Sequence, residues 1–507
     1  MILFRAIYAA VILWLAVYSL QALVLTLLYL RHRHEERPSI VVQEDSWPLV
    51  AVQLPVCNEQ HVIERLIDAA AALDYPHDRL EIQILDDSSD ATTALAQARA
   101  AHYRARGINV QVLRRPARVG FKAGALAWGL AHTRAEFLAV FDADFSPRPD
   151  FLRRTIPYML ADPSLGLIQT RWSHLNYTYS PLTRVQALAL DGHFVVEQTG
   201  RNRAGLLINF NGSGGVWRRS CIESVGGWQA DTMTEDMDLS YRAQLAGWRA
   251  LYLPNVDAPA ELPPQMEAFK RQQARWAQGS VQCLRKLGLR VIRSRLSVPQ
   301  KVMALLHMSS YLAQPLMVLW LLVMLPLLLH AELPRGPVVG LGLVGLGLPM
   351  LYIVATRALY PDWKRRILYF PLLAAVATGI TWSTSRAVWE GLTRWGGIFQ
   401  RTPKFRLEGR HGQWHSSVYR LWPDRTVVGE LILLLYALAT TVVAVLRGAF
   451  GTLPFLLLYV IGYAMAAGAS LWQGRQRSAG HLGLWLVAKV PWPWLRAGAC
   501  SGPPTAP

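Results

Sequence analysis

Apolar positions gather at the two ends of the chain and leave a middle of ordinary soluble composition. Residues 7–30 contain no charged side chain, and a helix of that length can cross a hydrocarbon core of roughly 30 Å. A cleaved signal peptide is the alternative, but the run is longer than a usual signal core, and basic residues follow it instead of a cleavage site. We therefore expect residues 1–30 to form an N-terminal transmembrane helix.

The positions of the basic residues predict the orientation of this helix. Arg31, Arg33 and Arg37 follow the apolar run, whereas only Arg5 precedes it. Positive residues tend to stay on the cytosolic side, so we expect the N-terminus outside and the middle of the chain in the cytosol. The predicted location is a cell membrane, inner or plasma, that the chain crosses several times.

The second half of the chain repeats the apolar pattern. Further apolar runs lie at residues 303–329, 337–356, 367–381, 427–446 and 450–472. Basic residues crowd the segments 357–366 and 401–425, so both segments should be cytosolic. Residues 367–399 must then cross the membrane an even number of times or not at all. A re-entrant hairpin and an apolar run followed by a Trp-rich interfacial helix both satisfy this requirement.

These runs define the expected domain boundaries. We expect a membrane region over residues 301–472, with a cytosolic or interfacial segment at about 382–425. Residues 473–507 form a C-terminal tail, and its Gly-Pro-Pro-Thr-Ala-Pro end predicts disorder.

Residues 40–300 alternate β-rich runs with helical ones. Strands are predicted at 50–54, 81–85, 109–113 and 137–141. Helical periodicity separates them, first over 59–73. This alternation predicts an α/β domain with a largely parallel, Rossmann-like sheet. Such a sheet binds ligands beyond the carboxyl ends of its strands, so the polar residues there are the candidate site.

Composition narrows the classes of protein. Of 507 residues, 52% are hydrophobic and 17% are charged, which excludes a disordered or wholly soluble chain, since soluble proteins carry about 25% charged residues. The formal charge of +18 is compatible with binding to nucleic acid, to anionic lipid or to a phosphorylated substrate. Nucleic-acid binding is disfavoured because the basic residues concentrate beside the apolar runs. The scattered Cys57, Cys221, Cys283 and Cys500 indicate neither a disulfide framework nor a zinc site.

Acidic residues follow the predicted strands. Asp86 ends the second strand, and Asp142 and Asp144 follow the fourth. Residues i and i+2 of an extended segment point the same way, so Asp142 and Asp144 can face one ligand and bring Mg²⁺ or Mn²⁺ to a diphosphate. An acid pair of this kind occurs by composition alone about twice in such a chain, so by itself it is equally compatible with a helix-capping loop.

A third acidic cluster opens a helical stretch at residues 234–238. Thr232 and Glu235 have the spacing of a capping box, which is a structural interpretation. The capping box does not account for Asp236. A carboxylate at a helix start beside a sugar could act as a general base and accept the proton of an acceptor hydroxyl.

The helical run 266–287 supplies basic and aromatic candidates. Gln272, Arg275 and Trp276 fall on one face; arginine meets phosphate in a bidentate way and tryptophan offers a flat plate for a pyranose. Lys122, at another helix start, is a further phosphate candidate. The remaining basic residues indicate a helix that lies on the membrane surface. They are Lys270, Arg271, Arg285, Lys286 and Arg290.

Taken together, these motifs resemble a known family. Residues 55–59 (Pro-Val-Cys-Asn-Glu), 86–87, 122–124, 142–144, 211–213 (Asn-Gly-Ser), 234–236 and 272–276 (Gln-x-x-Arg-Trp) occur in the order of the family 2 processive glycosyltransferases. The chain resembles the cellulose synthase superfamily, and most closely its mannan and glucomannan synthase-like branch, which includes bacterial members.

The resemblance implies a cytosolic GT-A type domain and a role for each matching residue. It implies donor contacts for Pro55, Glu59, Asp86, Lys122, Asp142, Gln272 and Arg275. It implies acceptor contacts for Asn211, Gly212, Ser213, Glu235 and Trp276. Asp144 would hold the divalent cation and Asp236 would be the catalytic base.

The expected function is a membrane-embedded, inverting β-glycosyltransferase that elongates and translocates a polysaccharide. The donor would be GDP-mannose, GDP-glucose or UDP-glucose, and the product a β-1,4-mannan or glucomannan, or a glucan. A ceramide glucosyltransferase-like enzyme with a lipid acceptor is the alternative within this fold. A transporter or scaffold is an alternative without catalysis, but it does not explain acids at successive strand ends. Residues 401–425 are a candidate gating segment.

Overall fold

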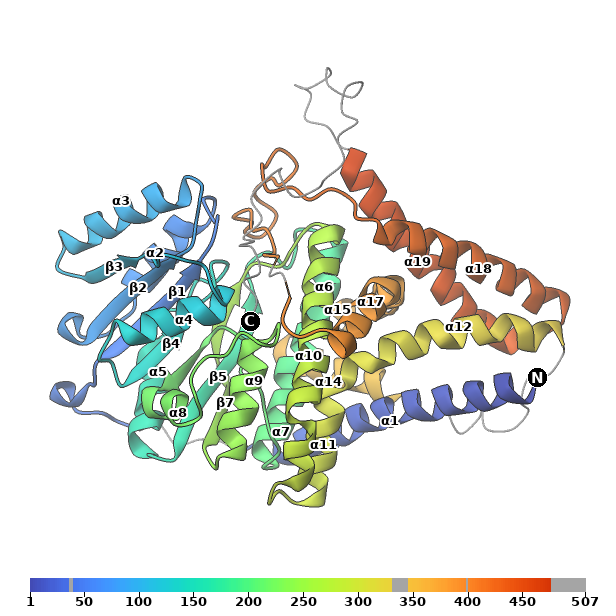
Figure 1. Ribbon diagram of the computed structural model, residues 1–507, viewed down its shortest axis with the longest axis horizontal. Helices are drawn as coiled ribbons and strands as arrows, with labels where there is room; N and C mark the ends of the chain where they lie inside the picture. Colours follow the sequence, from blue (N-terminus) through green and yellow to red (C-terminus); the bar gives the residue numbers. More distant parts are fainter. Residues whose placement is uncertain (36–39, 331–344, 398–399, 476–507) are drawn as a thin grey trace.

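The computed structural model describes residues 1–35, 40–330, 345–397 and 400–475. An α/β domain occupies one end of the molecule, on the left in Figure 1, and long apolar helices extend from it. The predicted tail lies outside the described residues, except that the last helix continues to Arg475.

One sheet forms the centre of the α/β domain. Its strands are β1 (Val50–Val56), β2 (Leu80–Asp86), β3 (Asn109–Leu113), β4 (Phe137–Val140), β5 (Leu165–His174), β6 (Gly215–Arg218) and β7 (Arg249–Ala260). Their order is β3-β2-β1-β4-β6-β5-β7. Only β6 runs antiparallel to its neighbours β4 and β5, so the sheet is mixed. The predicted α/β class and the four predicted strands are confirmed.

Helices cover both faces of the sheet, which explains why its central strands are buried and mostly apolar. The polar side chains among them pair with each other, as Gln53 does with Gln83. One face packs against α2 (Ile63–Ala71), α3 (Thr92–Arg104) and α5 (Phe151–Ala161). The other packs against α4 (Phe121–Ala131), α8 (Arg219–Ser224) and α9 (Glu235–Leu245). The helix predicted from residue 59 begins only at Ile63, after a left-handed Asn58 (φ 55°) and a turn over residues 60–62.

The other helices connect this domain to the apolar region. They are α1 (Ile2–His32), α6 (Pro181–Asp191), η3 (Gly192–Gln198), α7 (Thr199–Arg203), α10 (Met266–Arg293), α11 (Val298–Met308), α12 (Ala313–Leu329), α14 (Gly347–Leu359), α15 (Trp363–Ile367), α16 (Phe370–Gly379), α17 (Thr381–Thr393), α18 (Thr426–Leu446) and α19 (Leu453–Arg475). Segments α6, η3 and α7 follow one another without a break, and η3 is a π-helical turn. Short 3₁₀ turns lie at Glu44–Ser46, His77–Arg79, Ser310–Leu312 and Phe450–Thr452.

The apolar helices are those of a multi-pass membrane protein. Among the described residues, four are long and apolar enough to cross a membrane: Ile2–His32, Ser310–Leu329, Thr426–Leu446 and Phe450–Arg475. A helix pair over 363–393 is bent by 50° and has the length and composition of either a fifth, broken span or a re-entrant loop. The re-entrant hairpin and the interfacial helix expected for residues 367–399 both stay predictions. Of the run predicted at 337–356, the described part is α14, which continues to Leu359.

The prediction that Lys270 lies on the membrane surface is wrong. Its side chain is 2% exposed, and its Nζ lies 2.9 Å from Glu430 Oε1 of α18 and 3.3 Å from Glu267 Oε2. Arg285 packs over the Trp395 ring, and Lys286 pairs with Asp238. These basic residues join α10 to neighbouring elements, because a buried cation requires a carboxylate or polar partner.

Candidate active site

The carboxyl ends of β1, β2 and β4 meet at one edge of the sheet and open into a small cavity. Its polar lining comes from Glu59, Asp87, Arg118, Lys122, Asp142, Arg275, Arg401, Thr402 and Lys404, and Pro55 also lines it. These residues derive from β1, β2, α4, β4, α10 and the loop after α17. The fold therefore brings sequence-predicted residues from five separate motifs to one place.

Lys122 lies at the centre of the site. Gly120 (φ 74°) and Phe121 (φ 47°) turn the chain sharply into α4 and leave the ammonium of Lys122 facing inward. Its Nζ lies 2.6 Å from Asp142 Oδ1 and donates to Gly212 O at 2.8 Å. A cation at the start of a helix, beside backbone N–H groups, is suited to a diphosphate.

Two residues of the loop after α17 reach Glu59 and Asp144. Lys404 Nζ lies 3.1 Å from Glu59 Oε1 and 3.6 Å from Asp144 Oδ1, and Arg401 lies 3.3 Å from Glu59. Burial raises the pKa of both carboxyl groups, while Lys404 lowers both. The nearby carboxylates raise the pKa of the Lys404 ammonium despite its burial, so Lys404 stays charged at neutral pH.

The acidic pair of Asp142 and Asp144 could bind a divalent cation together with the phosphates of a substrate. Within the described ranges no group of three or more His, Cys, Asp or Glu side chains could hold a metal by itself. Mg²⁺ and Mn²⁺ are commonly held by one or two carboxylates together with substrate phosphates. Asp144 offers one such carboxylate and now pairs with the ammonium of Lys404, which stands in for a cation there.

Asp236 lies in the first turn of α9 and has the properties of a base. Its Oδ1 accepts the backbone N–H of Met237 at 2.8 Å. Burial, and then the neighbouring Glu235, raise its pKa to about 7, although Lys122 and Arg275 oppose this. A carboxylate with a pKa near the working pH is suited to accept and release a proton.

The predicted capping box is not formed. The helix begins at Glu235 with Thr234 as its N-cap, and no side chain caps it. Glu235 instead lies 3.8 Å from Lys122 Nζ and is largely buried. Glu235 therefore faces the site instead of capping the helix, whereas Asp238 of the same cluster pairs with Arg242 and Lys286.

The loop of Asn211, Gly212 and Ser213 connects the base to the donor side. Ser213 Oγ accepts the backbone N–H of Asp142 at 2.9 Å, which fixes the two motifs to each other. A Cβ atom on Gly212 would lie 2.9 Å from Asp236 Oδ2. The loop thus approaches the carboxylate of Asp236 as closely as its backbone allows.

Three residues beside this loop belong to none of the sequence motifs and were not predicted from the sequence. His193 Nδ1 lies 2.8 Å from Glu197 Oε2, and its Nε2 lies 3.0 Å from Asn211 Nδ2. Gln198 donates to Asn211 Oδ1 at 2.7 Å. All three come from the π-helical η3, and such turns are frequent at functional sites. The spacing of His193 and Glu197, four residues apart in a helical segment, is the signal that could have revealed them.

Among Asp86 and the residues of the Gln-x-x-Arg-Trp motif, only Arg275 lines the cavity. Asp86 is buried and accepts hydrogen bonds from Thr93 Oγ1 and Arg114 Nη1 at 2.7 and 2.8 Å, so it orders the loop after β2. Arg275 lines the cavity, while Gln272 and Trp276 are half-buried on the same helix. The nucleotide role of Asp86 and the sugar role of Trp276 remain predictions.

The close approach of Gly212 predicts a specific defect. Gly212→Ala should reduce the rate about 10- to 100-fold, because the new Cβ displaces the Asp236 carboxylate and small misplacements of catalytic groups have effects of this size. Gly205→Ala is the matched control: Gly205 also has a positive φ, of 69°, but a Cβ there meets nothing within 4 Å. Equal rates for the two variants, with both folded, would contradict the placement of Asp236.

The raised pKa of Asp236 predicts the pH profile. The base must be deprotonated, so kcat/KM should rise about tenfold per pH unit below about 7 and level off above it. Initial rates between pH 5 and 9 at low donor concentration measure this. A profile that is flat between pH 6 and 8 would exclude Asp236 as the titrating group.

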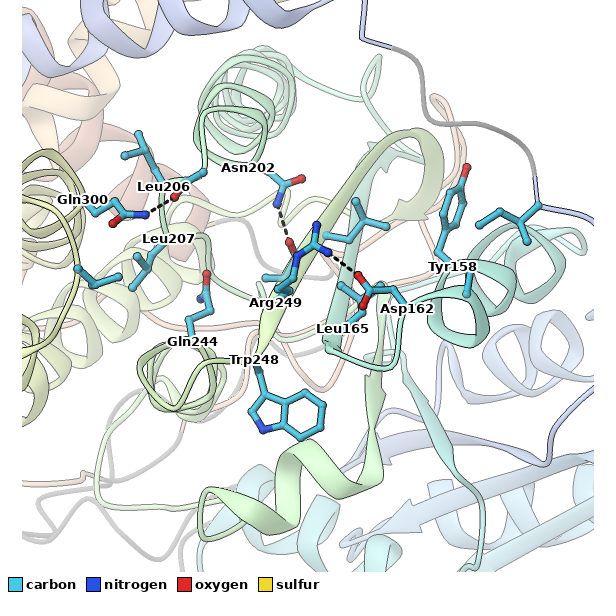
Figure 2. Close-up of a pocket in the computed structure, with 16 residues that line it drawn as sticks. Tyr158, Asp162, Leu165, Asn202, Leu206, Leu207, Gln244, Trp248, Arg249 and Gln300 are labelled. Carbon is cyan, nitrogen blue, oxygen red and sulfur yellow. Dashed lines mark hydrogen bonds and ion pairs between the residues drawn. The ribbon is translucent and has the colours of Figure 1, made fainter.

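Another cavity lies at the amino ends of β5 and β7, away from this site (Figure 2). Its polar side chains engage other groups of the protein. Arg249 pairs with Asp162 at 2.7 Å, Asn202 donates to Ala250 O, and Gln300 donates to Gly205 O. These contacts within the protein explain the presence of polar side chains in this cavity.

Comparison with known proteins agrees with the geometry. Residues 48–279 match the family described as glycosyltransferase like family 2. This segment contains every strand of the sheet together with Lys122, Asp142 and Asp236. The matched segment therefore supplies most of the site, and Arg401, Thr402 and Lys404 reach the site from outside this segment.

The chain also resembles curated plant proteins. It is 42% identical over 254 residues to glucomannan 4-beta-mannosyltransferase 2 of Arabidopsis thaliana, covering 49% of this chain and 48% of that protein. It is 43% identical over 253 residues to probable glucomannan 4-beta-mannosyltransferase 2 of Oryza sativa subsp. japonica, covering 49% and 44%. The chain thus spans about half the length of the curated relatives it matches.

A solved structure shares the fold. A mannosyltransferase from Pyrobaculum calidifontis, in complex with GDP-Man and Mn²⁺, aligns with a TM-score of 0.52 at 22% identity, over 77% of this chain and 99% of that one. The α/β domain accordingly has the GT-A-like fold, as the motifs predict.

Proposed function

We propose that the chain is a membrane-embedded, inverting β-glycosyltransferase that elongates a polysaccharide from a nucleotide diphosphate sugar. The observation that carries the proposal is the meeting of Lys122, Asp142 and Asp236 at one edge of the sheet. The resemblance to glucomannan 4-beta-mannosyltransferases supports a β-1,4-mannan or glucomannan as product and GDP-mannose as the first donor to test. GDP-glucose and UDP-glucose are the other candidate donors.

Each residue has a role in this reaction. Asp236 accepts the proton of an acceptor hydroxyl, which then attacks the anomeric carbon of the donor sugar from the face opposite the leaving diphosphate. Inversion converts an α-linked donor into a β-linked product. Lys122 and Arg275 offset negative charge on the leaving diphosphate. A divalent cation at Asp144, when bound, would act as a Lewis acid on the same phosphates.

The acceptor side lies toward the membrane helices. The loop 211–213 is held by η3, which packs against α1 and α14, and Tyr311 Oη donates to Gln273 Oε1 beside Trp276. A growing glycan that leaves Asp236 in this direction would enter the bundle of apolar helices, which supports translocation by the same chain across a cell membrane.

The segment 401–425 is proposed to gate the site. Arg401 and Lys404 now pair with Glu59 and Asp144, so a donor with its cation must displace them. Deletion of the segment should change the synthesis rate or donor affinity. Synthesis that is unaffected by the deletion would exclude this role.

A lipid acceptor is the second candidate within the same fold. The test is the fate of sugar from radiolabelled GDP-mannose in membranes that contain the full chain. A glycan that stays insoluble in organic solvent and is digested by β-mannanase supports polymer synthesis. A solvent-extractable lipid that carries one sugar would support the lipid acceptor and exclude the polymer.

A further inference from the structure

A cavity outside the active site is lined by arginines at the end of the first membrane helix. It lies between the ends of α1 and α14, segments η3 and α7, and residues 253–256 of β7, with a volume of about 570 Å³. Five arginines and one glutamate line it: Arg33, Arg153, Arg154, Arg171, Arg203 and Glu35. We call it the arginine cavity.

Two of these arginines bind acids outside the cavity. Arg153 pairs with Glu44 and Asp74, each at 2.9 Å, and Arg154 pairs with Asp150 at 3.3 Å. Their charges are partly offset by the α/β domain itself.

Arg33 and Arg171 differ, because their hydrogen bonds go to uncharged acceptors. Arg171 Nε donates to Pro254 O at 3.1 Å, and Arg33 Nε donates to His34 Nε2 at 3.0 Å. In the part of the chain that the structure describes, neither guanidinium forms an ion pair. Converging arginines repel one another in a partly enclosed space, so this arrangement favours a bound anion.

The position of the cavity indicates which anion. Helix α1 is long and apolar enough to cross a membrane and ends at His32, so Arg33 lies at the depth of the lipid headgroups. The lining also contains Leu359 and Val195, apolar residues that can contact the glycerol and the first acyl carbons. Guanidinium groups match phosphate oxygens in a bidentate way, and basic pockets between membrane helices are suited to anionic headgroups.

We propose that the arginine cavity binds the phosphodiester headgroup of an anionic phospholipid. The bound lipid would bridge α1, η3 and β7. Because η3 also carries His193, which contacts Asn211, the lipid would stabilise the segment that holds the acceptor loop. The proposal concerns a site separate from the catalytic residues and does not depend on which sugar is transferred.

The test is direct binding to the full chain in detergent, measured by native mass spectrometry. The probes are dihexanoyl phosphatidylglycerol, dihexanoyl phosphatidylcholine and inorganic phosphate. We expect phosphatidylglycerol to bind at least about tenfold more tightly than the other two probes, since it alone combines acyl chains with a headgroup of net negative charge. Equal affinity for phosphatidylcholine, or equally tight binding of inorganic phosphate, would overturn the proposal.

Variants locate the binding. Arg33→Gln and Arg171→Gln should each weaken phosphatidylglycerol binding about tenfold, through loss of a charge-assisted hydrogen bond. Arg31→Gln is the matched control, because Arg31 is exposed at the same helix end and does not line the cavity. If Arg171→Gln fails to fold, Arg33→Gln still decides, since Arg33 is an exposed residue at a helix end. Binding by Arg33→Gln that equals that of Arg31→Gln would refute the site.

Discussion

Replacement of Asp236 by Asn should reduce sugar transfer about 10²- to 10⁴-fold, the range that a general base contributes. The amide has nearly the shape of the carboxylate but cannot accept the proton of the acceptor hydroxyl. Asp236 is half-buried in the first turn of α9, and its pKa, raised to about 7, lets it serve as a base near neutral pH. The measurement is the initial rate of incorporation of labelled sugar.

A neighbouring acid supplies the control for this variant. Asp231 lies in the loop before α9, is half-exposed and pairs with Lys286 at 2.7 Å. Asp231→Asn should therefore retain nearly full activity. Donor affinity, measured separately by equilibrium binding, should change little in Asp236→Asn, because Asp236 contacts the acceptor side. Transfer by Asp236→Asn within tenfold of the unaltered protein would rule out this residue as the base.

Replacement of Asp144 by Asn should lower activity about 100-fold and raise the Mn²⁺ or Mg²⁺ concentration needed for half-maximal rate, since a Lewis-acid cation contributes several kcal/mol to transition-state stabilisation. The carboxylate of Asp144 is buried beside Lys404 and is the proposed cation ligand. Chelation by EDTA should abolish the activity of the unaltered protein, and added Mn²⁺ should restore it.

Asp150→Asn serves as the comparison for Asp144→Asn. Asp150 lies six residues along the same connection, at the start of α5, and pairs only with the half-exposed Arg154 among the ion pairs of the described chain. Its replacement should leave the metal dependence unchanged. A metal requirement identical in Asp144→Asn and the unaltered protein would mean that the cation binds elsewhere or is not used.

The sequence predicts those parts of the fold and site that depend on local pattern. The runs 50–54 and 137–141 are apolar except for Gln53, because their strands are covered on both faces. Once the strands are parallel, their carboxyl ends must meet, which is why the sequence assigns Asp86 and Asp142 to one edge of the sheet.

Contacts between distant segments could not be predicted in this way. Lys404 reaches Asp144 only because the chain returns from α17 to the edge of the sheet. Lys270 appears as an exposed basic residue in a helical pattern, yet it is buried because Glu430 of α18 packs against it. His193 acquires its position beside Asn211 from a π-helical turn, and its four-residue spacing from Glu197 does not reveal this contact between distant segments.

The stereochemistry of the product tests the central claim most directly. The purified full chain in lipid vesicles should receive GDP-mannose, GDP-glucose or UDP-glucose with Mn²⁺, and the glycan formed should be examined by NMR for its anomeric linkage. The account predicts a polymer of β-linked hexose, formed from at least one of these donors and absent with Asp236→Asn. An α-linked product, or no transfer from any of the donors, would contradict it.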